Sequence, residues 1–376
     1  MPTRGGIDSC VPIIDHVSQW LTKHGLPSRQ LRDMTTGRTV ALVCDITGHH
    51  PGPRYVLNAC LDTAPFGDPI LWRHAPTSGA IEDGWLHGRG SADSKAAIAI
   101  FMHLATHVRG AASQLHGSLT LLFDTDEHTG SFSGAKRYFG EPDTPCDILG
   151  VMIGYPGMDE LVIGGRGFLR AELTVQGKAD HTGSQREANN NNAVEKAAEL
   201  VRIIAKHRTP GPVDVHLNLP PKLTVTGIAG GESYSIVPDS CTISVDMRLT
   251  TTFDEATGKN LIETTVAQID RQWPSSIKPT KIVFHQSWPA YRLDENVSIR
   301  VALTRAAEYH LKKHLPPKVA GPSNIGNYLA KLGIDATAGL GVRYYALHGT
   351  DERIELATIP AIQATYHDAV LALLSP

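Results

Sequence analysis

Residues 94–124 contain the pattern that decides the fold: SKAAIAIFMHLATHV (94–108) is followed, after a short connection, by SLTLLFD (118–124). The first segment is alanine-rich and apolar over several turns, which predicts a buried or half-buried helix. The second is a short apolar run that ends on an aspartate, which is typical of a buried strand. A helix and a strand in this order indicate an α/β sheet with helices packed on its faces.

The same alternation extends to both sides of this pair. Residues 63–90 are rich in proline and glycine and form a long loop, and long loops in compact domains usually serve a function. Apolar runs predict further strands at Thr39–Ile46, Tyr55–Leu61 and Ile148–Ile153, and helices or helical segments at residues 8–25, Ser133–Phe139, Val297–His314, Ile325–Leu332 and Ile359–Leu374. The predicted fold class is therefore α/β, with a doubly wound mixed sheet that carries helices on both faces.

The pattern changes near Gly164. Segments Phe168–Val175 and Cys241–Leu249 alternate apolar and polar residues, as antiparallel strands with one solvated face do. Helical segments Asn192–His207 and Phe253–Trp273 surround them. We expect an inserted α+β domain, with these boundaries: first part of the catalytic domain at 1–165, insertion at 166–282, second part of the catalytic domain at 283–376.

Composition limits the classes of function. The chain has 376 residues, of which 41% are hydrophobic and 19% charged, and this indicates a folded protein of two domains. A formal net charge of −3 offers no basic face for nucleic acid. No apolar run approaches the roughly 18 residues that span a bilayer, and the first residues lack the apolar core of a signal peptide. Five cysteines without a CxxC pair do not form a disulfide framework. We expect a cytoplasmic protein without nucleic-acid or membrane partners.

Three polar clusters stand at the ends of predicted elements. Asp93 lies between a glycine-rich turn and a helix start, Glu127 and His128 follow the strand at 118–124, and His348 lies in a C-terminal loop. Each has an ordinary structural explanation: the acidic residues could cap helices, and a lone loop histidine is usually solvated. Because ligand sites in α/β sheets lie at the carboxyl ends of strands, the clusters could also meet and bind a metal ion.

In this order, the clusters resemble those of a known family of two-domain metallohydrolases. The family includes acetylornithine deacetylase, succinyl-diaminopimelate desuccinylase, aminoacylase and carboxypeptidase G. The resemblance runs from the strand at Tyr55 to the final helix. It rests on GWLHGRGSADSK (84–95), TDEHTGS (125–131), GKADHTG (177–183), residues 230–248 ending in IVPDSCTISVDMR, and HGTDE (348–352). It implies a hydrolase of C–N bonds with an inserted dimerisation domain.

The resemblance also implies roles for individual residues. In the family, two metal ions usually share one carboxylate, and Asp93 matches that bridge. His128 and His348 match the remaining ligands of one metal. Glu127 matches the general base that activates water. Further matches are Asp62 as the aspartate that orients a ligand, His181 as the histidine that reaches the site of a partner subunit, and Asn324 as a substrate contact.

The ligands of the other metal are altered. Cys60 stands where the family has a histidine, Tyr155 stands where it has a carboxylate before Pro156, and His128 replaces the second carboxylate of a Glu-Glu pair. A Cys60 thiolate could still bind zinc, but the phenol of Tyr155 has an ordinary pKa of about 10 and is a poor substitute ligand. We therefore expect one divalent transition metal per chain, manganese or zinc with iron(II) also compatible, and no second metal. Tyr155 and Cys60 would then contact substrate or fill the vacated space.

Three functions are compatible with these residues. The first is hydrolysis of an amide-type C–N bond in a small molecule that carries a carboxylate, with water activated by the metal and Glu127. The second is displacement of an amine from an activated aromatic ring, as in the nitroanthranilate aminohydrolase branch of the family. The third is a non-catalytic metal-binding relative. A homodimer or higher oligomer is expected, because His181 would act in trans.

Overall fold

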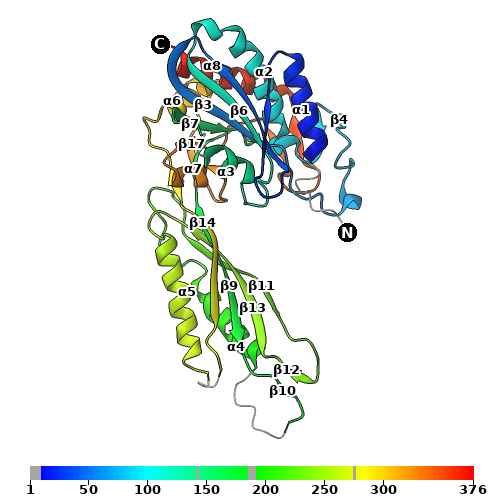
Figure 1. Ribbon diagram of the computed structural model, residues 1–376, viewed down its shortest axis with the longest axis vertical. Coiled ribbons are helices and arrows are strands. Elements are labelled where there is room, and N and C mark those ends of the chain that lie inside the picture. Colours follow the sequence, from blue (N-terminus) through cyan, green and yellow to red (C-terminus); the bar gives the residue numbers. More distant parts are fainter. Residues whose placement is uncertain (1–9, 141–143, 185–191, 274–276) are drawn as a thin grey trace. The chain divides into compact units, whose positions relative to one another are not determined.

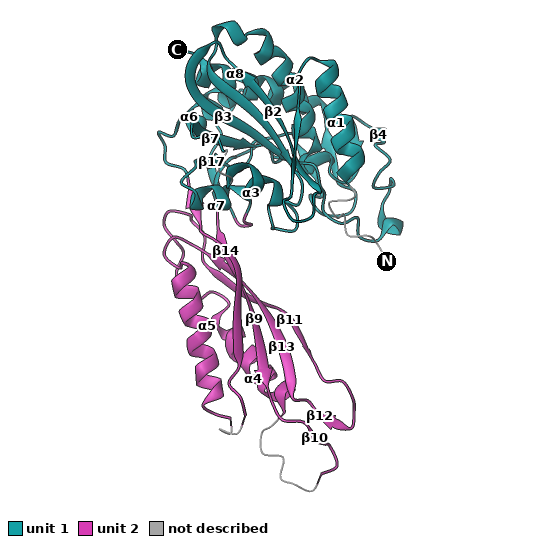
Figure 2. Ribbon diagram, in the orientation of Figure 1, with its two compact units in different colours: residues 1–164, 293–320, 324–376 teal, residues 165–292, 321–323 magenta. Residues whose placement is uncertain are grey.

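The computed structural model describes residues 10–140, 144–184, 192–273 and 277–376. They form two compact units, coloured separately in Figure 2: unit 1 comprises Met1–Gly164, Leu293–Ala320 and Asn324–Pro376, and unit 2 comprises Gly165–Arg292 and Gly321–Ser323. Unit 2 is thus an insertion between two parts of unit 1. The second predicted boundary, at residue 282, falls within strand β14 (Lys281–Trp288), which pairs with a strand of unit 2.

Unit 1 is built on a six-stranded mixed sheet (Figure 1). The pairs β6–β3, β3–β7 and β7–β17 are parallel, whereas the pairs β1–β2 and β2–β6 at one edge are antiparallel. The predicted mixed α/β sheet is therefore confirmed. The strands lie in the order β1 (Arg29–Arg32), β2 (Thr39–Thr47), β6 (His116–Asp124), β3 (His50–Cys60), β7 (Ile148–Ile153) and β17 (Ala336–Thr337).

Helices cover both faces of this sheet. Leu119, Leu121 and Phe123 of β6 point to one face and join the main core with the apolar side chains of four helices, α1 (Val11–Lys23), α2 (Ala96–Gly110), α6 (Ser298–Leu311) and α8 (Ile359–Leu374). On the other face, Tyr138 of α3 (Ser133–Phe139) donates to the hydroxyl of Thr120 at 3.5 Å. Burial on both faces explains why the central strands are continuous apolar runs.

The long loop at 63–90 is more ordered than its composition indicates. It contains the hairpin of β4 (Ile81–Glu82) and β5 (Trp85–His87), turned at Asp83 and Gly84, both of which have positive φ. This hairpin continues into a small antiparallel sheet with β19 (Arg353–Glu355) and β18 (Tyr344–Tyr345). The remaining elements of this part are α7 (Ile325–Lys331), β16 (Pro317–Ala320) and β8 (Leu161–Gly165). The small sheet joins the loop before Asp93 to the segment that carries His348.

Unit 2 is a four-stranded antiparallel sheet with two helices on one face. The sheet runs in the order β11 (Lys222–Gly230), β13 (Ser240–Leu249), β9 (Gly167–Gln176) and β14. Alternate side chains of β9 and β13, such as Leu173 and Ile243, pack with α4 (Ala193–Ile204) and α5 (Glu255–Asp270) in a separate core. The predicted α+β insertion is confirmed as a fold. Shorter strands are β10 (Asp180–His181), β12 (Ile236–Val237) and β15 (Tyr291–Arg292).

Among the described residues, no helix is both long and apolar enough to cross a membrane. The longest, α5 and α8, have 16 residues each, which at 1.5 Å per residue is shorter than the hydrocarbon core of a bilayer.

Candidate metal centre

The candidate metal centre forms where three parallel strands end. Residues Cys60 and Asp124 are register partners at the carboxyl ends of β3 and β6, and β7 lies on the other side of β3. The chain segments that leave these ends carry Asp62, then Glu127 and His128, then Tyr155. Parallel strands expose their carboxyl ends along one edge of a sheet, and this brings together side chains that are far apart in sequence.

Asp93 lies at the middle of the cluster. It is 5% exposed and lies in the kinked segment Ser91–Lys95, between the turn at Gly90 and helix α2. Its Oδ2 atom is 2.9 Å from Nε2 of His348 and 3.6 Å from Nε2 of His128. The alternative interpretation of Asp93 as a helix cap is wrong, because the N-cap of α2 is Lys95.

His128 is oriented by Asp62. One carboxylate oxygen of Asp62, Oδ2, accepts the backbone N–H of His128 at 3.0 Å and lies 3.2 Å from Nδ1 of its ring. This arrangement points the other ring nitrogen, Nε2, toward Asp93. Nε2 is buried and has no hydrogen-bond partner among the described residues. A carboxylate that fixes one imidazole nitrogen while the other stays free is the usual support of a metal-binding histidine.

These residues fit a divalent transition metal. Asp93, His128 and His348 each offer one ligand atom, and the three atoms lie within 4.8 Å of one another. Two imidazoles and one carboxylate form a donor set that binds zinc, manganese or iron(II) and leaves positions open for water and substrate. The unpartnered Nε2 of His128 is the observation that a bound cation would explain, because a buried polar atom without a partner is costly.

A second group of possible ligands shares His128. Cys60, Glu127 and His128 also offer atoms within 4.8 Å of one another. However, Cys60 is engaged elsewhere: its thiol lies 3.6 Å from Oδ1 of Asp93 and 3.2 Å from the hydroxyl of Ser94. Burial, and then the charge of Asp93, raise the pKa of the Cys60 thiol well above its ordinary value. The thiol is therefore protonated, which is not the form that binds metals.

The two carboxylates of the centre have opposite protonation preferences. Burial disfavours the charged form of Asp93, but its attraction to the imidazoles of His128 and His348 outweighs burial and holds its pKa below the ordinary value. Burial, together with the nearby charge of Asp93, raises the pKa of Glu127 to about 7. Asp93 is thus a stable anion, suited to hold a cation. Glu127 is poised to exchange a proton near neutral pH.

Tyr155 is bonded to Glu127. Its hydroxyl donates to Oε1 of Glu127, so that the other carboxylate oxygen, Oε2, remains available. Burial, and then the charge of Glu127, raise the pKa of Tyr155 well above its ordinary value, which keeps the hydroxyl protonated as a donor. Tyr155 therefore holds the carboxylate of Glu127 in place.

A buried ion pair that sequence reasoning did not assign to the site supports two of the candidate ligands. Glu352 accepts the guanidinium of Arg89 and the backbone N–H groups of Ala92 and Asp93, the latter two at 2.9 and 3.3 Å. Arg89 also donates to the carbonyl of His348 at 3.1 Å. The pair, the Arg89–Glu352 clamp, thus contacts the backbone of Asp93 and of His348.

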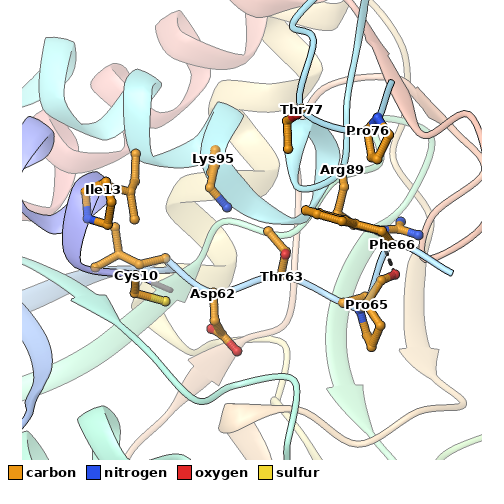
Figure 3. A pocket seen from close by; sticks show the side chains of 13 residues that line it. Cys10, Ile13, Asp62, Thr63, Pro65, Phe66, Pro76, Thr77, Arg89 and Lys95 are labelled. Carbon is orange, nitrogen blue, oxygen red and sulfur yellow. Dashed lines mark hydrogen bonds between the residues drawn. The ribbon is translucent and has the colours of Figure 1, made fainter. Parts of the chain in front are cut away.

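The same guanidinium reaches the segment that follows β3. Its Nε atom donates to the carbonyl of Pro65 at 3.2 Å, as drawn in Figure 3. The figure shows Arg89 beside a pocket that Asp62, Thr63 and Lys95 also line. The sequence carried a signal for the clamp, since Arg89 lies in the GRG turn and Glu352 closes the HGTDE motif.

Another pair that the sequence did not reveal lies beneath the centre. Asp124 is fully buried, and its Oδ1 atom accepts the side-chain amide of Asn58 at 3.0 Å. Burial, and then the charge of Asp62, raise the pKa of Asp124 well above the ordinary value. A neutral Asp124 therefore adds no second negative charge next to Asp62.

The remaining predicted site residues, Asn324 and His181, are described by their own local hydrogen bonds. Asn324 is the N-cap of α7: its side chain accepts the N–H of Gly326 at 2.8 Å, and Asn327 accepts its backbone N–H at 2.8 Å. His181 is exposed on β10 in unit 2, with Nδ1 accepting the N–H of Gly183 at 3.0 Å. Their roles in substrate binding and oxyanion stabilisation remain predictions.

Comparison with known proteins identifies the family. The sequence model of peptidase family M20/M25/M40 matches residues 56–372. The chain belongs to this family. Members are metallohydrolases that act on C–N bonds, and the family assignment therefore makes this chain such an enzyme. The matched region contains all of the candidate ligands.

Individual relatives are distant. The succinyl-diaminopimelate desuccinylase of Marinobacter nauticus is 26% identical over 334 residues, which cover 86% of this chain and 84% of that protein. Among solved structures, an aminopeptidase from Bacillus cereus superposes with a TM-score of 0.73 at 19% identity, covering 98% of this chain and 95% of that one. An M20 family metallo-carboxypeptidase from Sulfolobus solfataricus has a TM-score of 0.72 at 19% identity and covers 97% and 94%. These structures establish the fold.

Proposed function

We propose that this chain hydrolyses an amide-type C–N bond in a small molecule that carries a carboxylate, at a single divalent metal held by Asp93, His128 and His348. The observation that carries the proposal is the buried Nε2 atom of His128, which has no partner among the described residues and lies 3.6 Å from the carboxylate of Asp93. Glu127 and Tyr155 stand beside this cluster as a bonded pair.

The chemistry divides between the metal and the protein. A divalent ion in this position acidifies water and polarises an acceptor carbonyl. Glu127 removes the proton of the attacking water through Oε2, because Oε1 is occupied by the Tyr155 hydroxyl. Glu127 then returns the proton to the leaving amine. Asp62 keeps the His128 ring in one orientation throughout, since it is bonded to both the backbone and Nδ1 of that residue.

A single metal is proposed because the second set of ligands is poorly suited to a cation. The thiol of Cys60 is directed to Asp93 and Ser94 and is protonated. The hydroxyl of Tyr155 is engaged with Glu127 and is likewise protonated. Neither side chain therefore supplies an anionic ligand atom for a second metal ion. Manganese and zinc are the candidate ions.

The proposed base is tested with Glu127→Gln. Because Gln keeps the size of the side chain but cannot accept the proton, kcat is expected to fall by about 10²–10⁴-fold. Metal content, measured by mass spectrometry, should stay unchanged. Glu308→Gln, at an exposed glutamate that is bonded only to His314, is the matched control and should retain full activity. Retained turnover in Glu127→Gln would refute the mechanism.

We also propose that unit 2 mediates dimerisation and that His181 completes the site of the partner subunit. The likeness to the family supports this, together with the exposed position of His181. Mixing two inactive variants, Glu127→Gln and His181→Ala, should restore activity. Half of the dimers would be mixed and each would contain one intact site, which gives about a quarter of the wild-type rate. A mixture that stays inactive would contradict this assignment.

A second candidate function is displacement of an amine from an activated aromatic ring. The observation that favours it is that Cys60 and Tyr155 occupy the place of the second metal's ligands, which leaves an aromatic ring beside the proposed base. A panel of aromatic amines and N-acyl amino acids separates the two activities. Product release is measured for both classes, and ammonia is the product that marks turnover of the aromatic amines. Ammonia release from the aromatic panel alone would replace the amide proposal.

The third predicted function, a non-catalytic metal-binding relative, does not agree with a family of enzymes, and Glu127 is a second argument against it. A metal-binding protein without activity has no need of a buried carboxylate whose pKa lies near 7 and which a tyrosine holds in place. Metal analysis combined with the substrate panel tests this function. Stoichiometric metal with no turnover of any compound would support it.

A further inference from the structure

A second cluster of metal-binding side chains lies in the loop that precedes the candidate centre. His74, Glu82 and His87 each offer one ligand atom, and these atoms lie within 4.8 Å of one another. Glu82 and His87 come from the two strands of the β4–β5 hairpin, whose register pairs Glu82 with Trp85. His74 approaches from the preceding loop, with Nε2 3.2 Å from Oε2 of Glu82. The ligands are therefore brought together by the fold.

The imidazole rings of His74 and His87 lie close together but are not parallel. Their ring centroids are 4.5 Å apart at an interplanar angle of 56°, which is not a stacked arrangement. Zinc–nitrogen and zinc–oxygen bonds are about 2.0–2.2 Å long, so tetrahedral ligand atoms lie about 3.4 Å apart. The 3.2 Å separation of His74 and Glu82 already matches that spacing. The ligand atom of His87 lies within 4.8 Å of the other two.

His87 is the least solvated member of the cluster. It is 5% exposed, and its Nδ1 atom is buried without a hydrogen-bond partner among the described residues. Leaving a buried ring nitrogen unpartnered costs free energy that a ligand can recover. Burial also lowers the pKa of His87, so its ring is neutral at physiological pH, the form that binds metals. The buried, neutral imidazole is what distinguishes this cluster from a surface ion pair.

We propose that His74, Glu82 and His87 form a second metal site, separate from the Asp93 centre, that binds zinc through three protein ligands. Two imidazoles and one carboxylate are a common zinc donor set, and water would complete a tetrahedron. The ion would close the loop between residues 74 and 87 and fix the β4–β5 hairpin. The side chains of His74 and Glu82 are 24% and 37% exposed, which gives an ion access from solvent.

The competing occupant of the cluster is Arg73. Its guanidinium lies 2.8 Å from Oε2 and 2.9 Å from Oε1 of Glu82, so it neutralises the carboxylate when no metal is bound. The Arg73 side chain is 64% exposed, and exposed ion pairs of this kind contribute little. It can therefore move into solvent when an ion arrives. Removal of this side chain should strengthen metal binding.

The position of the site explains what an ion there would do. From His87 the chain continues through the GRG turn to Asp93, and the backbone of Gly88 is bonded to the carbonyl of Glu352 at 2.9 Å. The backbone N–H of Arg73 is bonded to Asp351 at 2.7 Å. Both contacts lead to the segment of His348. An ion that fixes the hairpin would stabilise the loop that supports the catalytic ligands.

The test compares zinc binding in four full-length, metal-free proteins by competition with a chromophoric chelator. His74→Gln is expected to bind the zinc equivalent of this site at least about tenfold more weakly than wild type does. Arg73→Ala should bind the same equivalent more tightly than wild type. His310→Gln is the control, because His310 is bonded only to Asp368 and belongs to no three-ligand cluster of the described residues.

The tighter zinc binding expected in Arg73→Ala cannot result from loss of folding, because a misfolded protein would not gain affinity for zinc. Cobalt(II) should also give stronger tetrahedral absorption per chain in wild type than in His74→Gln, in which only the Asp93 centre would remain. Equal zinc stoichiometry and affinity in wild type and His74→Gln would overturn the proposal. So would an unchanged or weaker affinity in Arg73→Ala, which would show that Glu82 serves only as the partner of that arginine.

Discussion

Breaking the Arg89–Glu352 clamp should cost more than any other single ion-pair substitution in unit 1. The side chains are 2% and 1% exposed, so removing either one leaves the other as a buried, unpaired charge. Loss of one partner of a buried pair costs about 3–5 kcal/mol. Glu352→Gln leaves Arg89 without its anion, and Arg89→Met leaves Glu352 with only two backbone N–H donors.

The double substitution should cost less than the sum of the two. Once both charges are removed, neither residue is left unpaired, so we expect a coupling energy of about 2–3 kcal/mol. Chemical denaturation of the metal-free proteins, followed by circular dichroism, provides the four free energies. A matched control is Arg343→Met, because the Arg343–Glu355 pair is 50% and 28% exposed and should contribute at most about 1 kcal/mol.

The clamp should also affect metal binding. Glu352 holds the N–H of Asp93, and Arg89 holds the carbonyl of His348, so Glu352→Gln weakens the support of Asp93 and Arg89→Met removes that of His348. Residues that orient metal ligands contribute about 10–100-fold to affinity. Single variants that each cost less than about 1 kcal/mol, or free energies that add without coupling, would refute the clamp as the support of the centre.

Three further predictions concern Tyr155, Asp124 and Asp214. Tyr155→Phe removes the hydroxyl that holds Glu127, so kcat should fall by about tenfold while metal affinity is kept, as steady-state kinetics and metal titration would show. Burial raises the pKa of Asp124, so the difference in stability between wild type and Asp124→Asn should shrink as the pH falls and the neutral carboxyl is favoured; Asp124→Ala should lose about 1–3 kcal/mol by leaving the Asn58 amide without its acceptor. Asp214, in unit 2, has a pKa lowered to about 2, chiefly because hydrogen bonds from Thr251, Leu217 and His216 outweigh burial. Its contribution of about 2 kcal/mol should be complete above pH 4 and vanish as the pH falls toward 2, so the stability difference between wild type and Asp214→Asn should disappear over that range in acid-denaturation curves.

Elements with strong periodicity were predictable from the sequence. The strand at Ile148–Ile153 has the predicted bounds because it is a short apolar run with clear ends, and the helix at Ser133–Phe139 has the predicted bounds as well. The sequence did not predict the β4–β5 hairpin within the loop at 63–90. Strands of two or three residues, such as β4 and β5, are too short for a period to show. Their existence depends on pairing with β19, which is far away in the sequence.

The candidate ligands were found through motifs, and their supports were missed. Asp93, His128 and His348 stand in recognisable stretches, and strand topology brings them together. The hydrogen bonds between Glu352 and Asp93 join residues 259 positions apart, which no local pattern reveals. The neutral state of Asp124 depends on burial beneath Asp62, which likewise requires the folded chain. Motifs thus predict which side chains can do chemistry, and packing sets how they are held and charged.

The number of ions at the Asp93 centre tests the central claim most directly. Crystals grown with excess manganese, measured on both sides of the manganese absorption edge, would locate each ion by anomalous scattering. We predict one peak at this centre, in contact with Asp93, His128 and His348. A second peak about 3.5–4 Å away, the usual spacing of two-metal sites, in contact with Cys60 would contradict the single-metal account.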